Sequence, residues 1–489
     1  MLKRKEILIV LLLTLAAILL HGYHPWAEDA EIYLPGVLRT LNPQLFPHDQ
    51  PFFESHAHLT LFPDLMAAIV RLSHLPFAWV LLLSHFACVF LFLWACWKLI
   101  SLCFSDSRAR WAGVALVAAL LTLPVAGTAL YIMDQYLNPR NIAAFAAIFA
   151  VVAVMERRYV RSALWLVFAA SVHPLMAVFA CSYCVLLPLL QKVDLRLRQA
   201  APAFASMAFV IPFFGELHPA SPAYRAAAGF HSFHYLTRWA WYEIVGAVAP
   251  VFIFWIFARM ARARRQPGLA LMCRALVVYG VVYFVGAVIL AIPARFETLA
   301  RIQPLRSLHL QYVLLLLIGG GFLGEYILKS RLWRWALLFV PLAGVMYAAQ
   351  AQLFAASDHL ELPGMSPKND YEKSFQWIRE NTPNDAFFAL DPEFLMDPGE
   401  DSQGFRAIAQ RSRLADYHKD SGAVSMFPPL ADEWYAQTQA LKDWQQFKPA
   451  DFALIRGRYG VTWIVVQNSQ AAALHCPYQN RTVSVCDLR

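Results

Sequence analysis

The chain has 489 residues, of which 59% are hydrophobic and 15% are charged, whereas an average soluble protein has about 25% charged residues. This apolar fraction exceeds what one globular core and surface absorb. It excludes intrinsic disorder, a collagen-like or coiled-coil rod and a purely cytosolic enzyme, and it predicts an α-helical polytopic membrane protein.

The net charge of +8 is divided unevenly along the chain. Residues 1–356 carry 28 Lys and Arg against 15 Asp and Glu, and residues 357–489 carry 13 against 18. The basic excess therefore belongs to the apolar part, where basic loops set the orientation of membrane proteins. This distribution excludes nucleic acid as a partner and predicts two domains, a transmembrane domain at 1–356 and a tail at 357–489.

Apolar stretches long enough to cross a bilayer recur throughout the first domain. We predict eleven spans, at 6–21, 77–100, 111–131, 140–155, 161–172, 174–190, 200–214, 239–258, 268–292, 307–328 and 332–356. The fifth and sixth spans meet at His173-Pro174, because proline interrupts the hydrogen bonds of a helix. Interrupted helices at membrane depth commonly line a cavity.

Positive charge predicts which side of the membrane each loop faces. Alternate turns hold 19 Lys and Arg, and the intervening short loops hold only 8. The N-terminus is therefore expected in the cytoplasm, with the loop 22–76 and the tail on the outer, periplasmic side of the cell (inner) membrane. No small-x-small cleavage pattern follows Leu20, so we interpret the first span as an uncleaved anchor rather than a signal peptide.

The tail alternates predicted helices with predicted strands, which is typical of a small extracytoplasmic α/β domain. Helices are expected at Tyr371–Glu380 and Trp434–Trp444, and strands at Ala386–Leu390, Val461–Val466 and Thr482–Leu488, the last at an edge of the sheet. Cys476 and Cys486 flank a turn at Asn480-Arg481. The sequence leaves two alternatives for this pair: a disulfide across a hairpin or two free thiols in a small core.

An acidic segment, His24-Pro25-Trp26-Ala27-Glu28-Asp29-Ala30-Glu31, follows the first span. Carboxylates beside a membrane surface are costly to desolvate, so they are expected to meet a cation, a basic partner or a reacting proton. The residues that follow fit an amphipathic helix lying in the interface. Glu28 and Asp29 are then either an acidic cap favoured by the helix dipole or part of a chemical site.

This arrangement resembles the GT-C superfamily of membrane glycosyltransferases, which transfer sugars from polyprenyl-phosphate carriers. The acidic pair after the first span matches at Glu28-Asp29, the interfacial helix at Glu31–Leu41 and the C-terminal domain at 357–489. Asn138-Pro139-Arg140-Asn141 followed by His173-Pro174 resembles a group of bacterial multi-pass proteins of the same architecture. The order Glu-Asp departs from the more frequent Asp-Asp or Asp-Glu, which leaves open which carboxylate is the base.

The resemblance implies an inverting transfer of a sugar from a polyprenyl-phosphate donor to a lipid, glycan or protein acceptor at the extracytoplasmic face. It nominates Asp29 as the base and Glu28 as its partner or as a metal ligand. The departing phosphate needs positive charge. The arginines on the expected outer side are Arg140, Arg295, Arg301 and Arg306; the last three, in one loop, are open to the alternative of binding bulk lipid phosphates.

Histidines gather near the predicted outer loops. His24 and His173 are expected to line the cavity, with capping of the broken helix as the alternative for His173. His56-x-His58 and His231-x-x-His234 suit a divalent metal or contacts with lipid headgroups. A divalent metal (Mg, Mn or Zn) is the one cofactor that this pattern leaves open.

Two other classes of function stay open. A transporter or lipid flippase would use the break at His173-Pro174 as part of its pathway, although the chain shows no convincing internal repeat. A catalytically inactive scaffold of the same fold would bind partners through its tail. For the enzyme, the expected partners are a polyprenyl-phosphate sugar donor and membrane lipids, and the sequence does not specify the oligomeric state.

Overall fold

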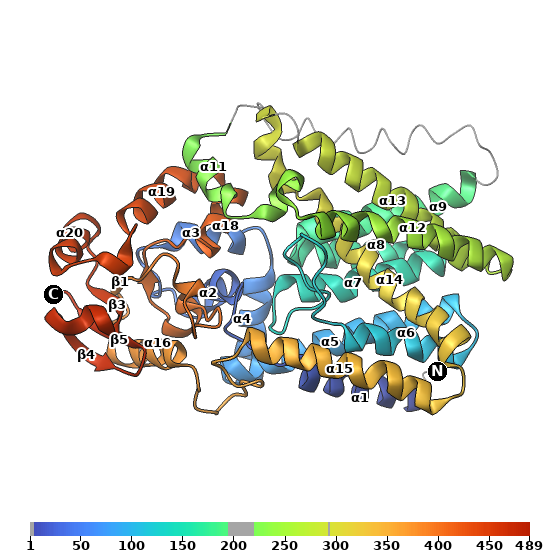
Figure 1. Cartoon of the computed structure of the whole chain (residues 1–489), viewed down its shortest axis with the longest axis horizontal. Helices are drawn as coiled ribbons and strands as arrows, with labels where there is room; N and C mark the ends of the chain where they lie inside the picture. The colour runs from blue at the N-terminus through green and yellow to red at the C-terminus, as the bar shows by residue number, and fades with distance from the viewer. Residues whose placement is uncertain (1–3, 194–219, 292–293) are drawn as a thin grey trace.

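The computed structural model describes residues 4–193, 220–291 and 294–489. A helical bundle and the C-terminal tail lie at opposite ends of the molecule, with the helices of the first loop between them (Figure 1). The bundle contains α1 (Arg4–His21), α5 (Phe77–Cys103), α6 (Ser107–Ala119), α7 (Pro139–Met155), α8 (Tyr159–Val172), α9 (Pro174–Val193), α12 (Trp241–Ala263), α13 (Pro267–Ala291), α14 (Leu308–Leu323) and α15 (Leu332–Leu353).

Six helices of the described residues are long and apolar enough to cross a membrane. They are α5, α9, α12, α13, α14 with its flanking turns, and α15. Four further predicted spans coincide with α1, α6, α7 and α8, and the predicted span 200–214 lies outside the described residues. The chain is a multi-pass membrane protein, and the number of eleven crossings stays a prediction.

The predicted span 111–131 is wrong in its extent. Helix α6 ends at Ala119, and residues 120–138 form an irregular, mostly buried segment that closes through a bridge between Pro124 and Tyr131. Proline has no backbone N–H to donate to a helix. Irregular backbone is tolerated at membrane depth where protein surrounds it, and this segment carries polar residues to the junction of bundle and first loop.

The predicted break at His173-Pro174 is confirmed. Helix α8 ends at Val172 and α9 begins at Pro174. The Nδ1 atom of His173 accepts the backbone N–H of Met176 at 3.3 Å, so the histidine caps the first turn of α9, where backbone donors lack helical partners.

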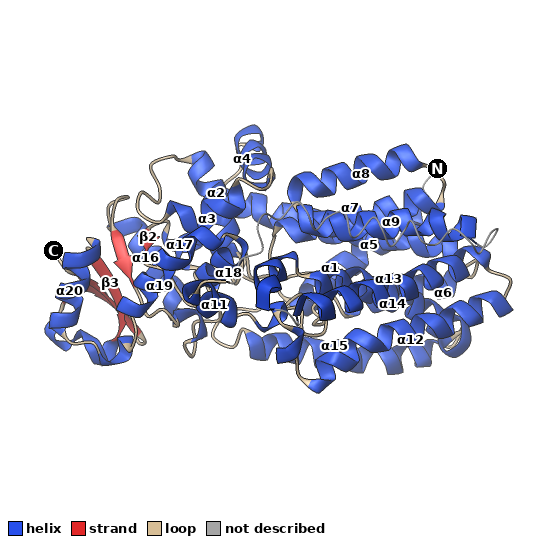
Figure 2. Cartoon of the chain, turned by 90° about the horizontal axis from the view of Figure 1, so that it is seen from above, coloured by secondary structure: helices blue, strands red, loops and turns tan. Residues whose placement is uncertain are grey.

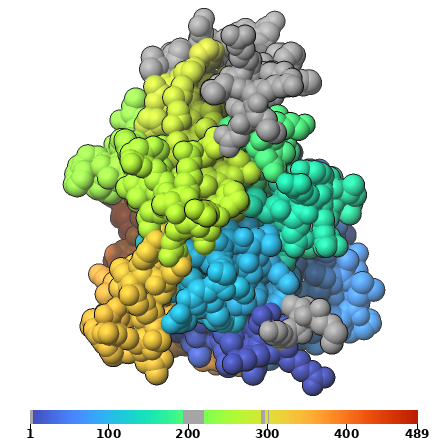
Figure 3. Space-filling view, turned by 90° about the vertical axis from the view of Figure 1, so that its right-hand side faces the viewer, coloured from blue at the N-terminus to red at the C-terminus, as the bar shows by residue number. Residues whose placement is uncertain are grey.

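The two groups of loops that the sequence assigns to opposite sides of the membrane lie at opposite ends of the molecule. The first loop and the tail share one end, and the turns between α5 and α6 and between α12 and α13 reach the other end (Figure 1). Figure 3 shows that far end directly, with the turn after α5 in blue and the turn after α12 in yellow-green. Basic residues lie at these turns, such as Arg108 in the first turn of α6 and Arg264 directly after α12.

The tail contains a five-stranded sheet of order β2-β1-β3-β5-β4. Strands β1 (Phe387–Ala389), β2 (Ser412–Arg413) and β3 (Trp463–Gln467) run parallel, and β5 (Val483–Asp487) is antiparallel to both β3 and β4 (His475–Gln479). Alternate side chains pack into two apolar layers, one against α16 (Asp370–Asn381) and α17 (Phe405–Ala409), the other against α20 (Pro449–Tyr459). The predicted α/β character of the tail is confirmed.

The sequence predicted that the last strand lies at an edge of the sheet, and this prediction is wrong. Strand β5 is buried between β3 and β4, and β4 forms the edge with alternating exposed side chains. Edge strands need such a polar face because one side of their backbone is unpaired. Cys476 and Cys486 form a disulfide across the β4–β5 hairpin, so of the two alternatives the structure contains the bridge.

The first loop forms three helices, α2 (Ala30–Leu41), α3 (Gln50–Ala57) and α4 (Phe62–Ser73). Figure 2 shows them between the sheet and the bundle. The predicted helix after the acidic pair is confirmed as α2, but its apolar residues Leu34 and Val37 are fully buried, and the helix packs against α4 and α17. Its apolar face is therefore covered by protein rather than open to lipid.

Candidate functional site

The tail holds the backbone of the acidic pair. Glu28 has a positive φ of 56°, a conformation that non-glycine residues rarely adopt, and its N–H donates to the carbonyl of Ser402 at 2.7 Å. The chain passes so close here that a Cβ on Gly404 would lie 3.0 Å from both the Trp26 carbonyl oxygen and Oε2 of Glu31. The position of Glu28 and Asp29 thus depends on contacts with the tail.

The carboxylate of Asp29 is directed at cations and not at the helix that it precedes. Asp29 is the N-cap residue of α2 but makes no side-chain capping bond. Its Oδ2 lies 2.7 Å from Nη1 of Arg140, and its Oδ1 lies 3.0 Å from Nζ of Lys419. Lys419 also lies 2.5 Å from Oε2 of Glu28. The side chain of Asp29 therefore does not cap α2 but joins a cluster of ion pairs.

These ion pairs set the charge of Asp29. Burial alone would raise the pKa of this carboxyl, but Lys419 and Arg140 outweigh burial and hold the pKa well below its ordinary value. The group is therefore ionised across the physiological range. It is also a weak proton acceptor for as long as both cations stay in contact with it.

The segment Asn138-Pro139-Arg140-Asn141 builds the bundle side of the site. Asn138 caps α7, since its side chain accepts the N–H of Asn141 at 3.1 Å, and Pro139 occupies the first helical position, where its missing N–H costs nothing. Arg140 then bridges two carboxylates, with Nη2 lying 3.2 Å from Asp134 and Nη1 contacting Asp29. This local structure fixes the guanidinium beside the acidic pair.

Arg306 is a half-buried cation, and no carboxylate of the described residues contacts it. Within the described parts of the chain it makes no ion pair; its guanidinium stacks over Phe233 at 4.7 Å, and its buried Nε donates to nothing. The charges of Arg140 and Asp29 both reach it. A buried donor atom without a partner is costly, so the arrangement suits an anion that approaches Arg306.

Three histidines surround these charges. Burial lowers the pKa of His56 to about 4, with Asp29 opposing and Arg306 adding to the shift. Burial also lowers the pKa of His231 to about 3, helped by Lys419 and Arg306 among its neighbours. The charges of Arg140 and Arg306 act on His173 as well. At neutral pH His56 and His231 are uncharged hydrogen-bonding groups.

A narrow apolar crevice in the bundle runs to Arg306. It is lined by side chains of α5, α7, α9 and α14, and Arg306 is its charged member. The lining residues are Phe92, Ala144, Ala147, Ile148, Met176, Phe179, Ala180, Arg306, His309, Leu310 and Val313. In this structure the crevice has a volume of about 10 Å³, which is room for a water-sized group. Its apolar walls and its one arginine are the kinds of group that contact the chain and the anionic head of a lipid phosphate.

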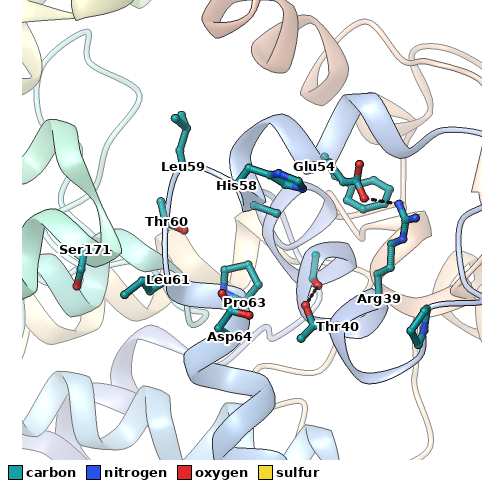
Figure 4. Close-up of a pocket in the computed structure, with 14 residues that line it drawn as sticks. Arg39, Thr40, Glu54, His58, Leu59, Thr60, Leu61, Pro63, Asp64 and Ser171 are labelled. Carbon is teal, nitrogen blue, oxygen red and sulfur yellow. Dashed lines mark hydrogen bonds and ion pairs between the residues drawn. The ribbon is translucent and has the colours of Figure 1, made fainter.

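A second cavity, of about 520 Å³, lies within the first loop (Figure 4). It is lined from α2 by Gly36 and Thr40, seven and eleven positions after Asp29 and hence on the same face of the helix. Arg39 and Glu54 pair at its wall, and Ser171 contributes from the end of α8. Its mixture of hydroxyl, charged and aliphatic groups suits a polar organic ligand.

The remaining predicted site residues lie elsewhere. His24 is fully buried, stacks on Phe354 at a ring distance of 3.7 Å and contacts Glu361 at 3.2 Å, so it belongs to the junction between α1 and the tail. Arg301 lies near Tyr224, outside the group around Asp29. The side chain of Arg295 lies outside the described residues.

Two buried arginines of the tail join it to the first loop. Arg406 lies 3.2 Å from Glu31, 2.5 Å from Asp49 and 2.9 Å from Asp420. Arg413 lies 2.7 Å from Glu31, 3.1 Å from Asp420 and also pairs with Asp416. We call this set (Glu31, Asp49, Arg406, Arg413, Asp416 and Asp420) the docking network. None of its side chains is more than 2% exposed.

Sequence reasoning missed Lys419 and the docking network, which lie more than 350 residues from their partners in the first loop. No local spacing reports such contacts. The available signal was the pair of basic residues Arg406 and Arg413 inside an otherwise acidic tail, next to a loop with excess carboxylates.

The predicted metal-ligand pairs do not converge. Among the described residues no group of three or more His, Cys, Asp and Glu side chains is placed to hold a metal ion. His56 faces Phe427 at a ring distance of 5.7 Å, whereas His58 is exposed at the cavity of Figure 4. His231 contacts Ser421 at 2.9 Å.

The fold and the charged site thus define a multi-pass membrane protein with a site between its bundle and its tail. No protein-family model matches the chain, and no curated protein sequence matches it. The solved structures that it resembles include the archaeal oligosaccharyltransferase AglB from Archaeoglobus fulgidus in complex with an inhibitory peptide and a dolichol-phosphate, at 12% identity and a TM-score of 0.47, covering 94% of this chain and 69% of that chain.

A second similar structure is the Archaeoglobus fulgidus oligosaccharyltransferase in complex with Zn and sulfate. It is 14% identical with a TM-score of 0.45, and the match covers 94% of this chain and 68% of that chain. The function proposed for this chain rests on the contacts of its own site.

Proposed function

We propose that the chain is an integral-membrane glycosyltransferase that transfers a sugar from a polyprenyl-phosphate donor to a hydroxyl of a lipid, glycan or protein acceptor. The observation that carries the proposal is the guanidinium of Arg306, which makes no ion pair with the described residues, lines a small apolar crevice and is acted on by the charge of Asp29. Hydrocarbon, anion and base sites are adjacent, as this reaction requires.

The crevice and the arginines support a phospholipid-like donor. A prenyl chain gains free energy by leaving water for an apolar surface, and the crevice between α5, α7, α9 and α14 offers one. Its phosphate would meet Arg306 first. Arg140 is the second guanidinium within reach, and such charge-assisted contacts are the strongest hydrogen bonds that a protein makes to phosphate.

The reaction then needs one base and charge stabilisation on the leaving group. The acceptor oxygen attacks the anomeric carbon, the carbon–oxygen bond to the phosphate breaks, and its electron pair leaves with the polyprenyl phosphate. Asp29 takes the proton of the acceptor hydroxyl. Arg306 and Arg140 stabilise the negative charge on the departing phosphate. Asp29 is favoured as the base over Glu28 because it shares its surroundings with Arg306 and His56.

The residues present do not fit a divalent metal. Both carboxylate oxygens of Asp29 are taken by Arg140 and Lys419, and Glu28 shares the same lysine. A lysine ammonium between two carboxylates occupies the place that a cation would need. No step above is therefore routed through a metal.

The outer, periplasmic face of the inner membrane is the side that we assign to the site. The disulfide between Cys476 and Cys486 supports it, because such bonds persist in oxidising compartments. The basic turns at the far end of the bundle support a cytoplasmic position for that end. The cavity of Figure 4, on the same face of α2 as Asp29, is where we place the acceptor.

The test is binding of farnesyl phosphate and of farnesol, its uncharged counterpart, to the full chain in nanodiscs. The wild type is expected to prefer the phosphate. Arg306→Gln should weaken phosphate binding by about ten- to a hundredfold and leave farnesol unchanged. Arg301→Gln, in the same loop, is the matched control and should bind as the wild type does. Equal binding of phosphate and alcohol by the wild type would refute the donor site.

A further inference from the structure

The tail contributes a charged side chain directly to the acidic pair. Lys419 is the first residue of α18 (Lys419–Met426), and its ammonium bridges Glu28 and Asp29 at 2.5 and 3.0 Å. It is the one residue of the tail whose cation contacts these two carboxylates among the described residues. The site between bundle and first loop is therefore incomplete without the tail.

The docking network positions the backbone of this lysine. One oxygen of Asp416 accepts the N–H groups of His418 at 2.6 Å and of Lys419 at 2.5 Å, which caps the start of α18. The other oxygen of Asp416 pairs with Arg413. The network thus holds the base of the Lys419 side chain, while the four-carbon stem leaves the ammonium free to swing.

The charges at the site balance before a ligand arrives. Three carboxylates (Glu28, Asp29 and Asp134) face three cations (Arg140, Lys419 and Arg306). A phosphate that reaches Arg306 adds negative charge beside Asp29, so a cation must change its partner or the two anions repel. The balance makes the site responsive to the donor.

Lys419 is the cation best able to change partner. Arg140 is tied to Asp29 and to Asp134, and its helix is part of the bundle. Lys419 is a compact point charge on a flexible stem and remains 15% exposed. Arg306 stacks over Phe233 at 4.7 Å, the Phe233 ring lies 5.1 Å from that of His231, and His231 contacts Ser421 of α18 at 2.9 Å. Arg306 and the start of α18, where Lys419 lies, are therefore linked through His231 and Phe233.

We propose that Lys419 exchanges partners during the reaction: without donor its ammonium holds Glu28 and Asp29, and with donor it moves to the phosphate and releases Asp29 to act as the base. This inference rests on the proposed function and assigns Lys419 to the donor-phosphate site. The proton of the acceptor hydroxyl goes to Asp29, while Lys419 keeps its own proton and stabilises the leaving group together with Arg306.

The exchange would couple basicity to donor binding. With Lys419 and Arg140 in contact, the pKa of Asp29 stays far below its ordinary value, and removal of one cation raises it. Asp29 would therefore become an effective base only once the phosphate is present. A residue that acts in this way is expected to alter donor affinity and not only stability.

The first test compares Lys419→Met with Lys419→Arg in the nanodisc assay with farnesyl phosphate and farnesol. Lys419→Met should bind the phosphate about tenfold more weakly and farnesol unchanged, whereas Lys419→Arg should restore affinity to within about threefold. Lys442→Met, at an exposed position of the same tail, is the control. Unchanged phosphate binding by Lys419→Met would overturn the inference and leave the Arg306 site standing.

A second test guards against the case in which Lys419→Met binds weakly only because it is misfolded. Asp29→Asn removes the competitor for Lys419, so it should bind farnesyl phosphate several-fold more tightly than the wild type. The double variant Asp29→Asn/Lys419→Met should lose that gain, because Lys419 is the cation that was freed. Weaker or equal binding by Asp29→Asn, or a gain that survives in the double variant, would overturn the exchange. Loss of phosphate preference in the wild type and in Arg306→Gln alike would instead overturn the donor site.

Discussion

Asp29 and Glu31 are two residues apart, both are acidic and both pair with cations of the tail, yet their surroundings differ. Glu31 is fully buried between Arg406 and Arg413. Asp29 remains 21% exposed, and Glu28 remains 40% exposed. The docking network is closed by protein, whereas the acidic pair adjoins Arg306, a cation that has no carboxylate in contact within the described residues.

This difference indicates that the charges of the docking network hold the structure together, whereas those around Asp29 are available to a ligand. A fully buried ion network fixes the arrangement of two segments, although Oδ1 of Asp49 has no hydrogen-bond partner. A site that keeps an unpaired cation, partial exposure and an adjoining crevice can exchange partners when an anion arrives. The predictions below follow from this contrast.

The largest expected effect is on turnover in Asp29→Asn. Removal of the base should lower sugar transfer by about 10²- to 10⁴-fold, measured with labelled polyprenyl-phosphate sugars in proteoliposomes, with the melting temperature close to that of the wild type. Glu28→Gln is the matched control and should lose less, because Glu28 contacts Lys419 alone among the cations described. Full transfer by Asp29→Asn contradicts the assignment.

A substitution in the docking network, Arg406→Met, should lower stability, in contrast to Asp29→Asn, which should lower turnover. Arg406→Met leaves the buried Asp49 without its cation and leaves Glu31 and Asp420 with Arg413 alone, which should cost about 3–5 kcal/mol of the free energy that holds the tail in place. Limited proteolysis of the tail and thermal unfolding measure it. Arg379→Met, whose partner Glu380 is an exposed neighbour, should change stability by less than about 1 kcal/mol. Equal losses of stability in Arg406→Met and Arg379→Met would contradict a structural role for the docking network.

A third prediction concerns pH at the junction of α1 and the tail. Burial raises the pKa of Glu361 from 4.5 to about 8, and burial lowers the pKa of His24 to about 4, so near neutral pH their contact joins two uncharged groups. Between 4.5 and about 8 the folded state binds more protons at Glu361 than the unfolded state does. Stability should therefore fall as pH rises through this window.

The variant Glu361→Gln checks this prediction. It removes the titrating carboxyl and keeps the shape, so the difference in melting temperature between pH 5 and pH 8 should shrink relative to the wild type. The control is Asp432→Asn, at an exposed position of α19 (Ala431–Ala440). It should leave the dependence of the melting temperature on pH as it is in the wild type. An unchanged or steeper slope in Glu361→Gln would show that another group governs the pH dependence.

The smallest effect is expected at the cavity of Figure 4. Ser171→Trp adds an indole to the cavity wall and should reduce sugar transfer by about tenfold through displaced acceptor, while farnesyl phosphate binds as it does to the wild type. Ser73→Trp, at the exposed end of α4, is the control. Reduced phosphate binding by Ser171→Trp would mean that the cavity serves the donor.

Much of the architecture was accessible from local sequence. Apolar runs predicted the bundle helices, the proline after His173 predicted the break in the helix, and the alternation of apolar strands and helices predicted the tail. The segment after Ala119 was misjudged because its apolar composition resembles a span, whereas its backbone is held by surrounding protein. Strand order in the tail depends on contacts that no strand encodes alone.

The site was accessible only in part. Asp29, Arg140, Arg306 and His173 were nominated from sequence. The structure pairs Asp29 with Arg140 at 2.7 Å, and the charges of this pair act on Arg306 while those of Arg140 and Arg306 act on His173. Lys419 was not, because its partners precede it by about 390 residues and only the folded tail brings it to the acidic pair. His24 was expected to line the cavity, but its side chain contacts Glu361 at the junction of α1 and the tail instead.

A structure of the full chain in nanodiscs with bound farnesyl phosphate tests the central claim most directly. We expect the phosphate within about 4 Å of the Arg306 guanidinium, the distance of an ion pair, the prenyl chain in the crevice between α5, α7, α9 and α14, and Asp29 facing the phosphate. A phosphate bound elsewhere, with Arg306 still stacked on Phe233 and Asp29 turned to bulk water, would contradict the account.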